Sequence, residues 1–83
     1  MRATYLFKQE PDTSVIRDKF GMYGNGNVLM ATINGHPTSM VINKMGLPSA
    51  NYSITYTIDR DAENIVTKEF NRTLKGMGGK RKR

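Results

Sequence analysis

The sequence predicts an α+β fold, in which a small antiparallel sheet of about four strands carries a C-terminal helix on one face. Three observations point to this class. Apolar and polar residues alternate in several short segments, as they do in half-buried strands. An Asn-Gly pair separates two apolar runs, which is a strong hairpin signal, and the apolar residues near the C-terminus recur at helical spacing. The 83 residues are enough for one small domain.

The first two elements are expected to be a strand and a short helix. The strand covers Ala3–Gln9, where Thr, Leu and Lys fall on one face and Tyr and Phe on the other. A proline then interrupts the pattern, and Thr13–Phe20 is expected to form the helix. Asp12 or Thr13 can cap its start, and Gly21 can end it.

Three more strands are expected in the middle of the chain. Val28–Ile33 and Ser39–Asn43 form a hairpin joined by the loop Asn34–Pro37. Since both faces of the first strand are mostly apolar, it is expected in the centre of the sheet. Lys44–Asn51 contains Gly and Pro and is expected to be a loop, and Tyr52–Asp59 alternates as a half-buried strand does.

The C-terminal segment decides the fold class, because its apolar residues share one face only if it is a helix. The helix is expected to start near Asp61 and to end at Gly76. Its apolar face consists of Val66, Phe70, Thr73, Leu74 and Met77. A helix on one side of the sheet leaves Ser53, Thr55 and Thr57 on a candidate open face.

Positive charge is concentrated at the C-terminus. The net charge is +6, and the four consecutive basic residues Lys80–Arg83 supply +4 of it. They follow the segment Gly76–Gly79, which is expected to be a hinge. We therefore expect one domain over residues 1–75 and a Gly-hinged basic tail over residues 76–83. A cationic segment on a nearly neutral body is typical of proteins that meet a polyanion, most often nucleic acid.

The C-terminal helix is expected to extend this basic tail. Its cations Lys68, Arg72 and Lys75 fall nearly opposite the apolar face. With the tail they would form a strip of up to seven cations that can follow phosphates. The candidate phosphate-binding residues are Lys68, Arg72, Lys75, Lys80, Arg81, Lys82 and Arg83. The alternative is that the helix face is only solvated and that the tail only aids solubility.

Two further residues are candidates for function. Tyr23 lies in the Gly- and Asn-rich loop Gly21–Asn27, where an aromatic ring can stack on an unpaired base. His36 is the single histidine, and it supports one enzyme hypothesis, a metal-independent ribonuclease. An ordinary turn histidine is the favoured interpretation of His36, because no carboxylate adjoins it in the sequence.

The expected function is non-enzymatic binding of nucleic acid, with RNA and DNA both open. The basic helix face and the tail would contact phosphates, and three consecutive antiparallel strands followed by a helix occur in several small nucleic-acid-binding architectures. The alternative is a small protein–protein interaction module or inhibitor that binds a larger partner through its sheet face or edge. A homo-oligomer is compatible with either function.

Composition excludes some classes of site. The chain has no cysteine, so disulfides and thiolate metal sites are absent, and no metal or other cofactor is expected. We see no secretory leader and no apolar run of about 18 residues, the length of a membrane span. The expected location is therefore the cytoplasm, with the nucleoid or, in a eukaryote, the nucleus as the place of nucleic-acid binding.

Overall fold

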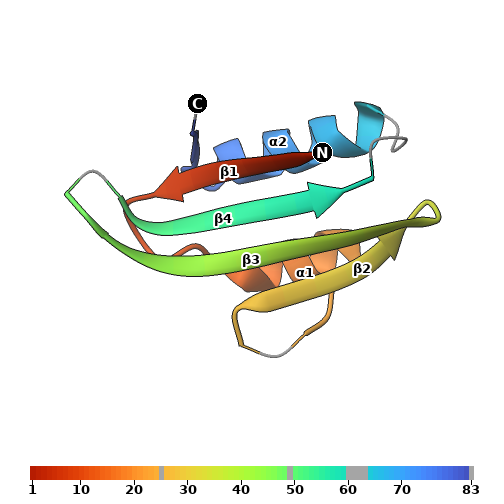
Figure 1. The fold of residues 1–83 in the computed structure, drawn as a ribbon, viewed down its shortest axis with the longest axis horizontal. Helices are drawn as coiled ribbons and strands as arrows, with labels where there is room; N and C mark the ends of the chain where they lie inside the picture. Colours follow the sequence, from red (N-terminus) through yellow and green to blue (C-terminus); the bar gives the residue numbers. More distant parts are fainter. Residues whose placement is uncertain (25, 49, 60–63, 83) are drawn as a thin grey trace.

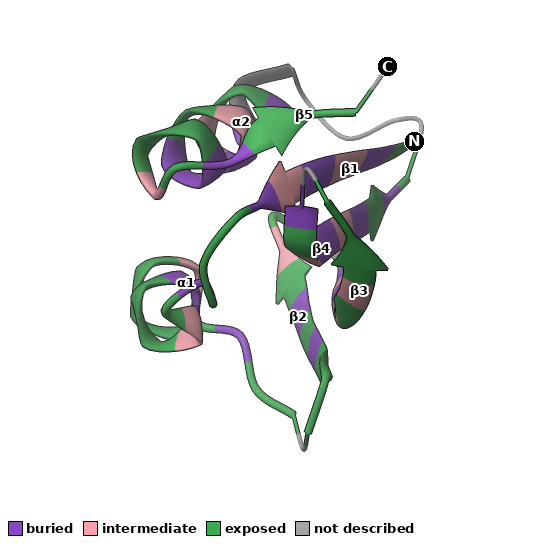
Figure 2. Ribbon diagram, turned by 90° about the vertical axis from the view of Figure 1, so that its left-hand side faces the viewer, coloured by how far each residue is buried: buried purple, intermediate pink, exposed green. Residues whose placement is uncertain are grey.

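The computed structural model describes residues 1–24, 26–48, 50–59 and 64–82. In this part of the chain, two helices pack on one face of a five-stranded antiparallel sheet (Figures 1 and 2). The elements are β1 (Arg2–Phe7), α1 (Thr13–Phe20), β2 (Val28–Ile33), β3 (His36–Leu47), β4 (Ala50–Ile58), α2 (Asn64–Gly76) and β5 (Lys80–Arg81). The strand order is β2-β3-β4-β1-β5. The predicted α+β class, with a C-terminal helix on one sheet face, is confirmed.

Strand β1 lies inside the sheet, although it is the first element of the chain. It pairs with β4 on one side, where Tyr5 lies opposite Ile54, and with β5 on the other. Because side chains alternate along a strand, Ala3, Tyr5 and Phe7 share one face, and all three are buried under the helices. Helix α2 covers the part of the sheet near β1, and α1 covers the part near β2 (Figure 2).

The hydrophobic core lies between the sheet and the two helices. The ring of Phe70 in α2 contacts Phe20 of α1 edge-on, with centroids 4.5 Å apart, and Tyr56 of β4, with centroids 5.2 Å apart. Such pairs contribute about 0.5–1.5 kcal/mol each beyond the area that they bury. The largest fully buried side chains are those of Tyr5, Ile16, Leu29, Met40, Ile54, Tyr56, Ile58, Phe70 and Leu74.

The short helix α1 has the bounds that the sequence predicts, Thr13–Phe20. A carboxylate oxygen of Asp12 accepts a hydrogen bond from the backbone N of Ser14 at 3.0 Å, which satisfies one free donor of the first turn. Gly21 ends the helix with φ 63°, a left-handed conformation that glycine adopts without strain. Ile16 is the fully buried residue of α1, and Phe20 packs against the core beside it.

The first hairpin is tighter than expected. Its turn consists of Asn34 and Gly35 alone, with φ 51° and 81°, the two positive values of a type I′ turn. His36 and Pro37 already pair with β2. The expected four-residue loop is therefore wrong, because proline is tolerated in the first residues of a strand.

The expected loop Lys44–Asn51 is also wrong. Strand β3 continues to Leu47, and β4 starts at Ala50, so the two strands form one long hairpin (Figure 1). The register shifts between Lys44 and Leu47, as it does at a β-bulge. The glycine at position 46 lies within this irregular segment, so it marks a break in pairing and not the end of the strand.

Strand β2 is an edge strand of the sheet, whereas its apolar residues predicted a central one. The central position belongs to β4 and β1, which pair across more than 40 intervening residues. The apolar side chains on the outer face of β2 are consequently exposed: Val28 by 41% and Met30 by 52%.

The C-terminal segment differs most from its expected form. Lys80 and Arg81 pair with β1 as strand β5, and the backbone N of Lys82 donates to Thr4 O at 2.8 Å. The expected hinge is a tight connection, because Gly79 is buried. A Cβ at Gly79 would lie 2.6 Å from Cζ of Phe7, so only glycine allows this approach.

Helix α2 presents to the core the face that the sequence predicts. Val66, Phe70, Thr73 and Leu74 are all buried. The expected start of the helix near Asp61 lies outside the described residues, and the described helix begins at residue 64.

Candidate nucleic-acid interface

Four cations surround one surface groove at the C-terminal end of α2. Lys75 belongs to the last turn of α2, whereas Lys80, Arg81 and Lys82 lie on and beside β5. With Gly79 they line a groove of about 870 Å³, and all four basic side chains are exposed. No carboxylate is among the lining residues, so nothing in the lining offsets its positive charge.

The pairing of β5 with β1 distributes these cations over two sides of the sheet. Lys80 pairs with Leu6, so it lies on the face away from the helices. Arg81 pairs with Tyr5, so it lies on the helix side. Burial raises the pKa of Tyr5 and of Tyr56, and the positive charge of Arg81 opposes this rise in both phenols. The groove therefore wraps around the β5 edge.

The three predicted cations of α2 are exposed, but they do not all join the groove. Arg72 Nη1 lies 3.2 Å from Glu69 Oε1, and the other oxygen of this carboxylate lies 3.5 Å from Lys19 Nζ. Glu69 thus offsets part of the charge of the helix face. Lys68 is exposed on the same helix, and only Lys75 lines the groove.

The structure therefore brings together a subset of the predicted strip. Four of its members line one groove, Lys68 and Arg72 extend along α2 from it, and Arg83 lies outside the described residues. The sequence indicated the cations but not their convergence, since β5 pairing depends on contacts with β1 that are more than 70 residues away.

We call the sheet face opposite the helices the open face. By the strand registers it carries Arg2, Thr4, Leu6, Val28, Met30, Thr32, Ser39, Val41, Asn43, Ser53, Thr55, Thr57 and Lys80. The predicted residues Ser53, Thr55 and Thr57 lie on it, and they are buried, half-buried and exposed, respectively. Oγ1 of Thr55 forms a hydrogen bond with Oγ1 of Thr4 at 2.8 Å.

The strands are free of carboxylates. None of the residues of β1, β2, β3, β4 and β5, all of which the structure describes, is Asp or Glu. The acidic residues that the structure describes belong instead to the helices and connections. The open face consequently combines hydroxyl groups and apolar side chains with Arg2 and Lys80, a composition that favours anions over cations.

Tyr23 lies beside the edge strand β2 and is not part of a freely moving loop. It exchanges two backbone hydrogen bonds with Met30, from Tyr23 N to Met30 O at 2.9 Å and from Met30 N to Tyr23 O at 2.7 Å. Because paired residues of antiparallel strands share a face, the Tyr23 ring belongs to the open face, where 69% of the residue is exposed. Gly24 allows this approach, since a Cβ there would overlap Val28 O.

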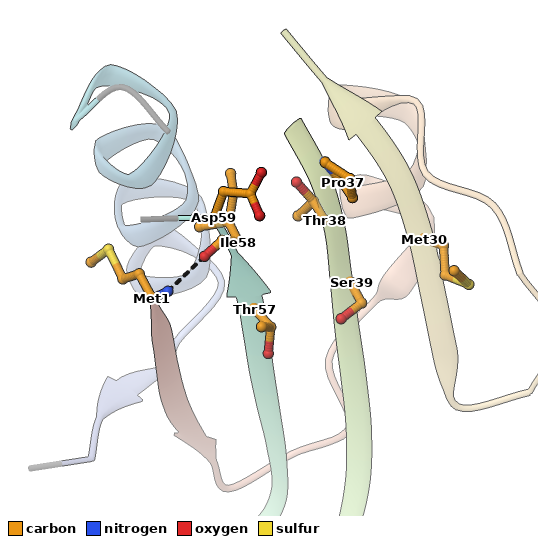
Figure 3. A pocket seen from close by; sticks show the side chains of 8 residues that line it. All are labelled: Met1, Met30, Pro37, Thr38, Ser39, Thr57, Ile58 and Asp59. Atoms are coloured by element: carbon orange, nitrogen blue, oxygen red, sulfur yellow. Dashed lines mark hydrogen bonds between the residues drawn. The ribbon is translucent and has the colours of Figure 1, made fainter. Parts of the chain in front are cut away.

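A shallow hollow adjoins the Met30 side chain on the open face. It measures about 460 Å³ and is lined by Met1, Met30, Pro37, Thr38, Ser39, Thr57, Ile58 and Asp59 (Figure 3). Met30, Ser39 and Thr57 lie side by side across β2, β3 and β4, so the small serine forms the floor of the hollow.

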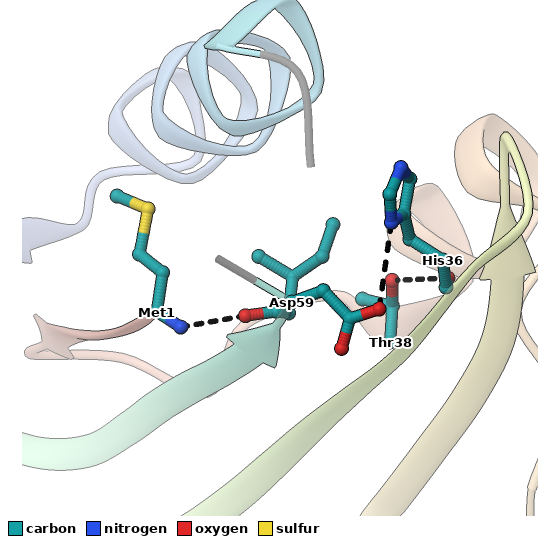
Figure 4. A network of polar contacts seen from close by, with 5 residues as sticks. Met1, His36, Thr38 and Asp59 are labelled. Atoms are coloured by element: carbon teal, nitrogen blue, oxygen red, sulfur yellow. Dashed lines mark hydrogen bonds and ion pairs between the residues drawn. The ribbon is translucent and has the colours of Figure 1, made fainter. Parts of the chain in front are cut away.

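His36 is paired with a carboxylate that the sequence did not indicate. His36 Nδ1 lies 3.4 Å from Asp59 Oδ2, and Thr38 Oγ1 donates to the backbone O of His36 at 3.1 Å (Figure 4). Antiparallel pairing of β3 and β4 joins these residues, which are 23 positions apart. His36 shares the helix-side face with Ile33, three strands from β5. Arg81 lies in the register of Ile42, six residues along β3 from His36, so the histidine is not part of the groove.

A pocket of about 1010 Å³ lies on the other side of Lys80, beneath the connection between β1 and α1. Its lining residues are Leu6, Phe7, Lys8, Gln9, Glu10, Pro11, Asp12, Pro48, Met77, Gly78 and Lys80. Two cations and two carboxylates among them balance each other, which makes this pocket a poorer site for a polyanion than the groove. In the part of the chain that the structure describes, no group of three acidic or histidine side chains could hold a metal ion.

A comparison of the chain with known protein families, curated proteins and solved structures found no match. Neither of the two described helices is long and apolar enough to cross a membrane. The function is therefore inferred from the groove and the open face.

Proposed function

We propose that this protein binds nucleic acid without catalysing a reaction on it, and that the groove between α2 and β5 holds the phosphates. The convergence of Lys75, Lys80, Arg81 and Lys82 on one groove supports this proposal. Each cation is exposed, and the lining contains no carboxylate. Arg81 adds a guanidinium that can bind a phosphate through two parallel hydrogen bonds.

The proposal has a quantitative consequence for salt dependence. Each phosphate contact with duplex DNA contributes about −0.9 to the slope of log K against log salt. Four contacts in the groove give a slope of about −3.6, and participation of Lys68, Arg72 and Arg83 would raise the magnitude to about 6. The slope therefore indicates how many of the seven predicted cations contact phosphates.

A charge-matched pair of variants tests the proposal. We expect the triple variant Lys80→Gln, Arg81→Gln and Lys82→Gln to reduce the magnitude of the salt slope by about 2.7 and to weaken binding at least tenfold. Fluorescence anisotropy with labelled oligonucleotides at several salt concentrations measures both quantities.

The control replaces the same amount of charge elsewhere on the surface: Arg17→Gln, Lys19→Gln and Lys44→Gln, all exposed positions. It should leave the slope nearly unchanged. Equal losses in the two triple variants would show that only net charge matters and would contradict a groove. Absence of binding by the unmodified protein would dismiss the function.

The second candidate is a protein–protein interaction module. It is favoured by the exposed apolar side chains of Val28 and Met30 on the edge strand β2. A partner that stays bound after nuclease treatment and is lost in a Met30→Ser variant would support this function. Unchanged capture by the triple groove variant would separate it from binding through nucleic acid.

A further inference from the structure

We infer that the ligand is a single-stranded nucleic acid that lies across the open face, with its phosphates at the β5 side and an unpaired base on Tyr23. This inference rests on the proposed function and adds the strand state of the ligand and its path. It follows from the order of side chains across the sheet, from the fixed position of Tyr23, and from the charges of the face.

The side chains of the open face change in chemistry from one edge of the sheet to the other. The β1 and β5 side carries the cations Arg2 and Lys80. The middle strands carry small hydroxyl side chains, which can donate hydrogen bonds to phosphate or sugar oxygens. The β2 side carries an aromatic ring and a thioether, from Tyr23 and Met30, which suit the faces of bases.

One row of paired residues crosses the open face from the aromatic side to the cationic side. The registers place Tyr23, Met30, Ser39, Thr57 and Arg2 next to one another on successive strands. Four strand spacings of about 4.8 Å make the row about 19 Å long. A stacked strand rises about 3.4 Å per nucleotide, so about six nucleotides cover the row. The hollow between Met30 and Thr57 lies along this path (Figure 3).

The position of Tyr23 favours an unpaired strand over a duplex. Two hydrogen bonds to Met30 hold its backbone, so little conformational freedom is lost when a base binds. Its ring is exposed and flanked by the Met30 side chain. A duplex presents phosphates outward and keeps its base faces stacked inside, so it can use the groove but not this ring.

The positive charges of the open face favour a polyanion as the ligand of this face. An exposed apolar patch alone would also suit a protein partner or a second copy of the chain. The patch formed by Tyr23, Val28 and Met30 lies on strands without carboxylates, and the cations Arg2 and Lys80 lie toward the other edge of the same face. Asp59, a carboxylate just beyond β4 that lines the hollow, lies 3.4 Å from His36 Nδ1. Two copies placed face to face would oppose these cations, whereas a nucleic acid would neutralise them.

The test compares single-stranded and duplex probes of about 12 nucleotides, twice the length of the row. In anisotropy titrations at constant salt, Tyr23→Ala is expected to weaken single-strand binding about 5- to 150-fold, the range for one lost base stack. Duplex binding should stay unchanged. Tyr23→Phe keeps the ring and should bind like the unmodified protein. Leu47→Ala, which removes another exposed apolar side chain at a hairpin tip, should also leave binding unchanged.

The outcomes separate this inference from the proposed function. If single strand and duplex bind alike and Tyr23→Ala affects neither, while the groove variant weakens both, nucleic-acid binding stands and the path across the open face is refuted. If no probe binds, both proposals fail. If sedimentation shows a dimer that Tyr23→Ala dissociates without loss of oligonucleotide binding, the patch is a contact between copies and the inference is overturned. Circular dichroism confirms that each variant is folded.

Discussion

At the scale of single residues, Asn71 connects α2 to the sheet. Its side-chain oxygen accepts hydrogen bonds from the hydroxyl groups of Tyr5, at 2.8 Å, and Tyr56, at 2.9 Å. Both tyrosines are fully buried, so their hydroxyl groups depend on this acceptor. The sequence did not indicate this role, because the three residues come from three separate elements.

Replacement of Asn71 by alanine should destabilise the fold. Leaving a buried donor without an acceptor costs about 1–3 kcal/mol, so we expect a loss in the free energy of unfolding of that size for Asn71→Ala. Urea unfolding followed by circular dichroism measures it. Asn43→Ala, at an exposed strand position, is the matched control and should change stability by less than about 0.5 kcal/mol. Equal stability of the two variants would refute the role of Asn71.

The same tyrosines predict an alkaline loss of stability. Burial raises the pKa of Tyr5 and Tyr56 above the ordinary value of 10.0. Above pH 10 the unfolded chain therefore releases phenol protons that the folded chain still holds, and stability falls as pH rises toward the native pKa values. Urea midpoints measured from about pH 8 to pH 11 should decline above pH 10. The decline should be shallower in Tyr5→Phe, and an identical decline in both proteins would contradict the effect.

At the scale of elements, the position of β5 depends on one close contact. Gly79 lies between Phe7 and the carbonyl oxygen of Leu74, from which an added Cβ would be 2.8 Å away. The turn after α2 therefore packs closely against β1 at Gly79, in addition to the hydrogen bond between Asn71 and Tyr5.

Alanine at position 79 should displace β5. We expect Gly79→Ala to lower the free energy of unfolding by about 1–3 kcal/mol, the usual cost of overpacking, and to weaken oligonucleotide binding because Lys80 and Arg81 move. Thermal unfolding and anisotropy measure the two effects. Gly76→Ala is the matched control, since a Cβ there would meet open space. A similar loss in both glycine variants would argue against the contact.

The elements also show what periodicity can and cannot reveal. The spacing of Val66, Phe70 and Leu74 predicted α2 correctly, because a helix buries residues that are near in sequence. The interior position of β1, between β4 and β5, was not predictable, since alternation shows which face of a strand is buried but not which strand is its neighbour. Val28 and Met30 gave β2 apolar residues on both faces and so suggested a central strand, although both residues are exposed at the sheet edge.

At the scale of the whole molecule, the carboxylates are kept out of the strands, whereas basic residues occur in both the helices and the sheet. The described acidic residues lie in the helices, at the cap of α1 or in connections: Glu10, Asp12, Asp18, Asp59 and Glu69. The candidate cations were predictable as a strip, since they are near in sequence. That Lys80 shares the open face with Arg2 was not predictable, because this requires β1 to lie between β4 and β5.

The place of β1 also determines how the molecule reaches its folded state. β1 precedes the other described strands in the sequence, yet its two neighbours in the sheet, β4 and β5, lie after residue 49. Pairings of such high contact order close large loops and make folding slow. Until β1 pairs with β4, the β2–β3–β4 meander has an unpaired edge at β4. An unpaired strand edge can pair with another chain and so promotes aggregation. Because Lys80 and Arg81 are placed by their pairing with β1, the groove that they line exists only when β1 occupies its place in the sheet.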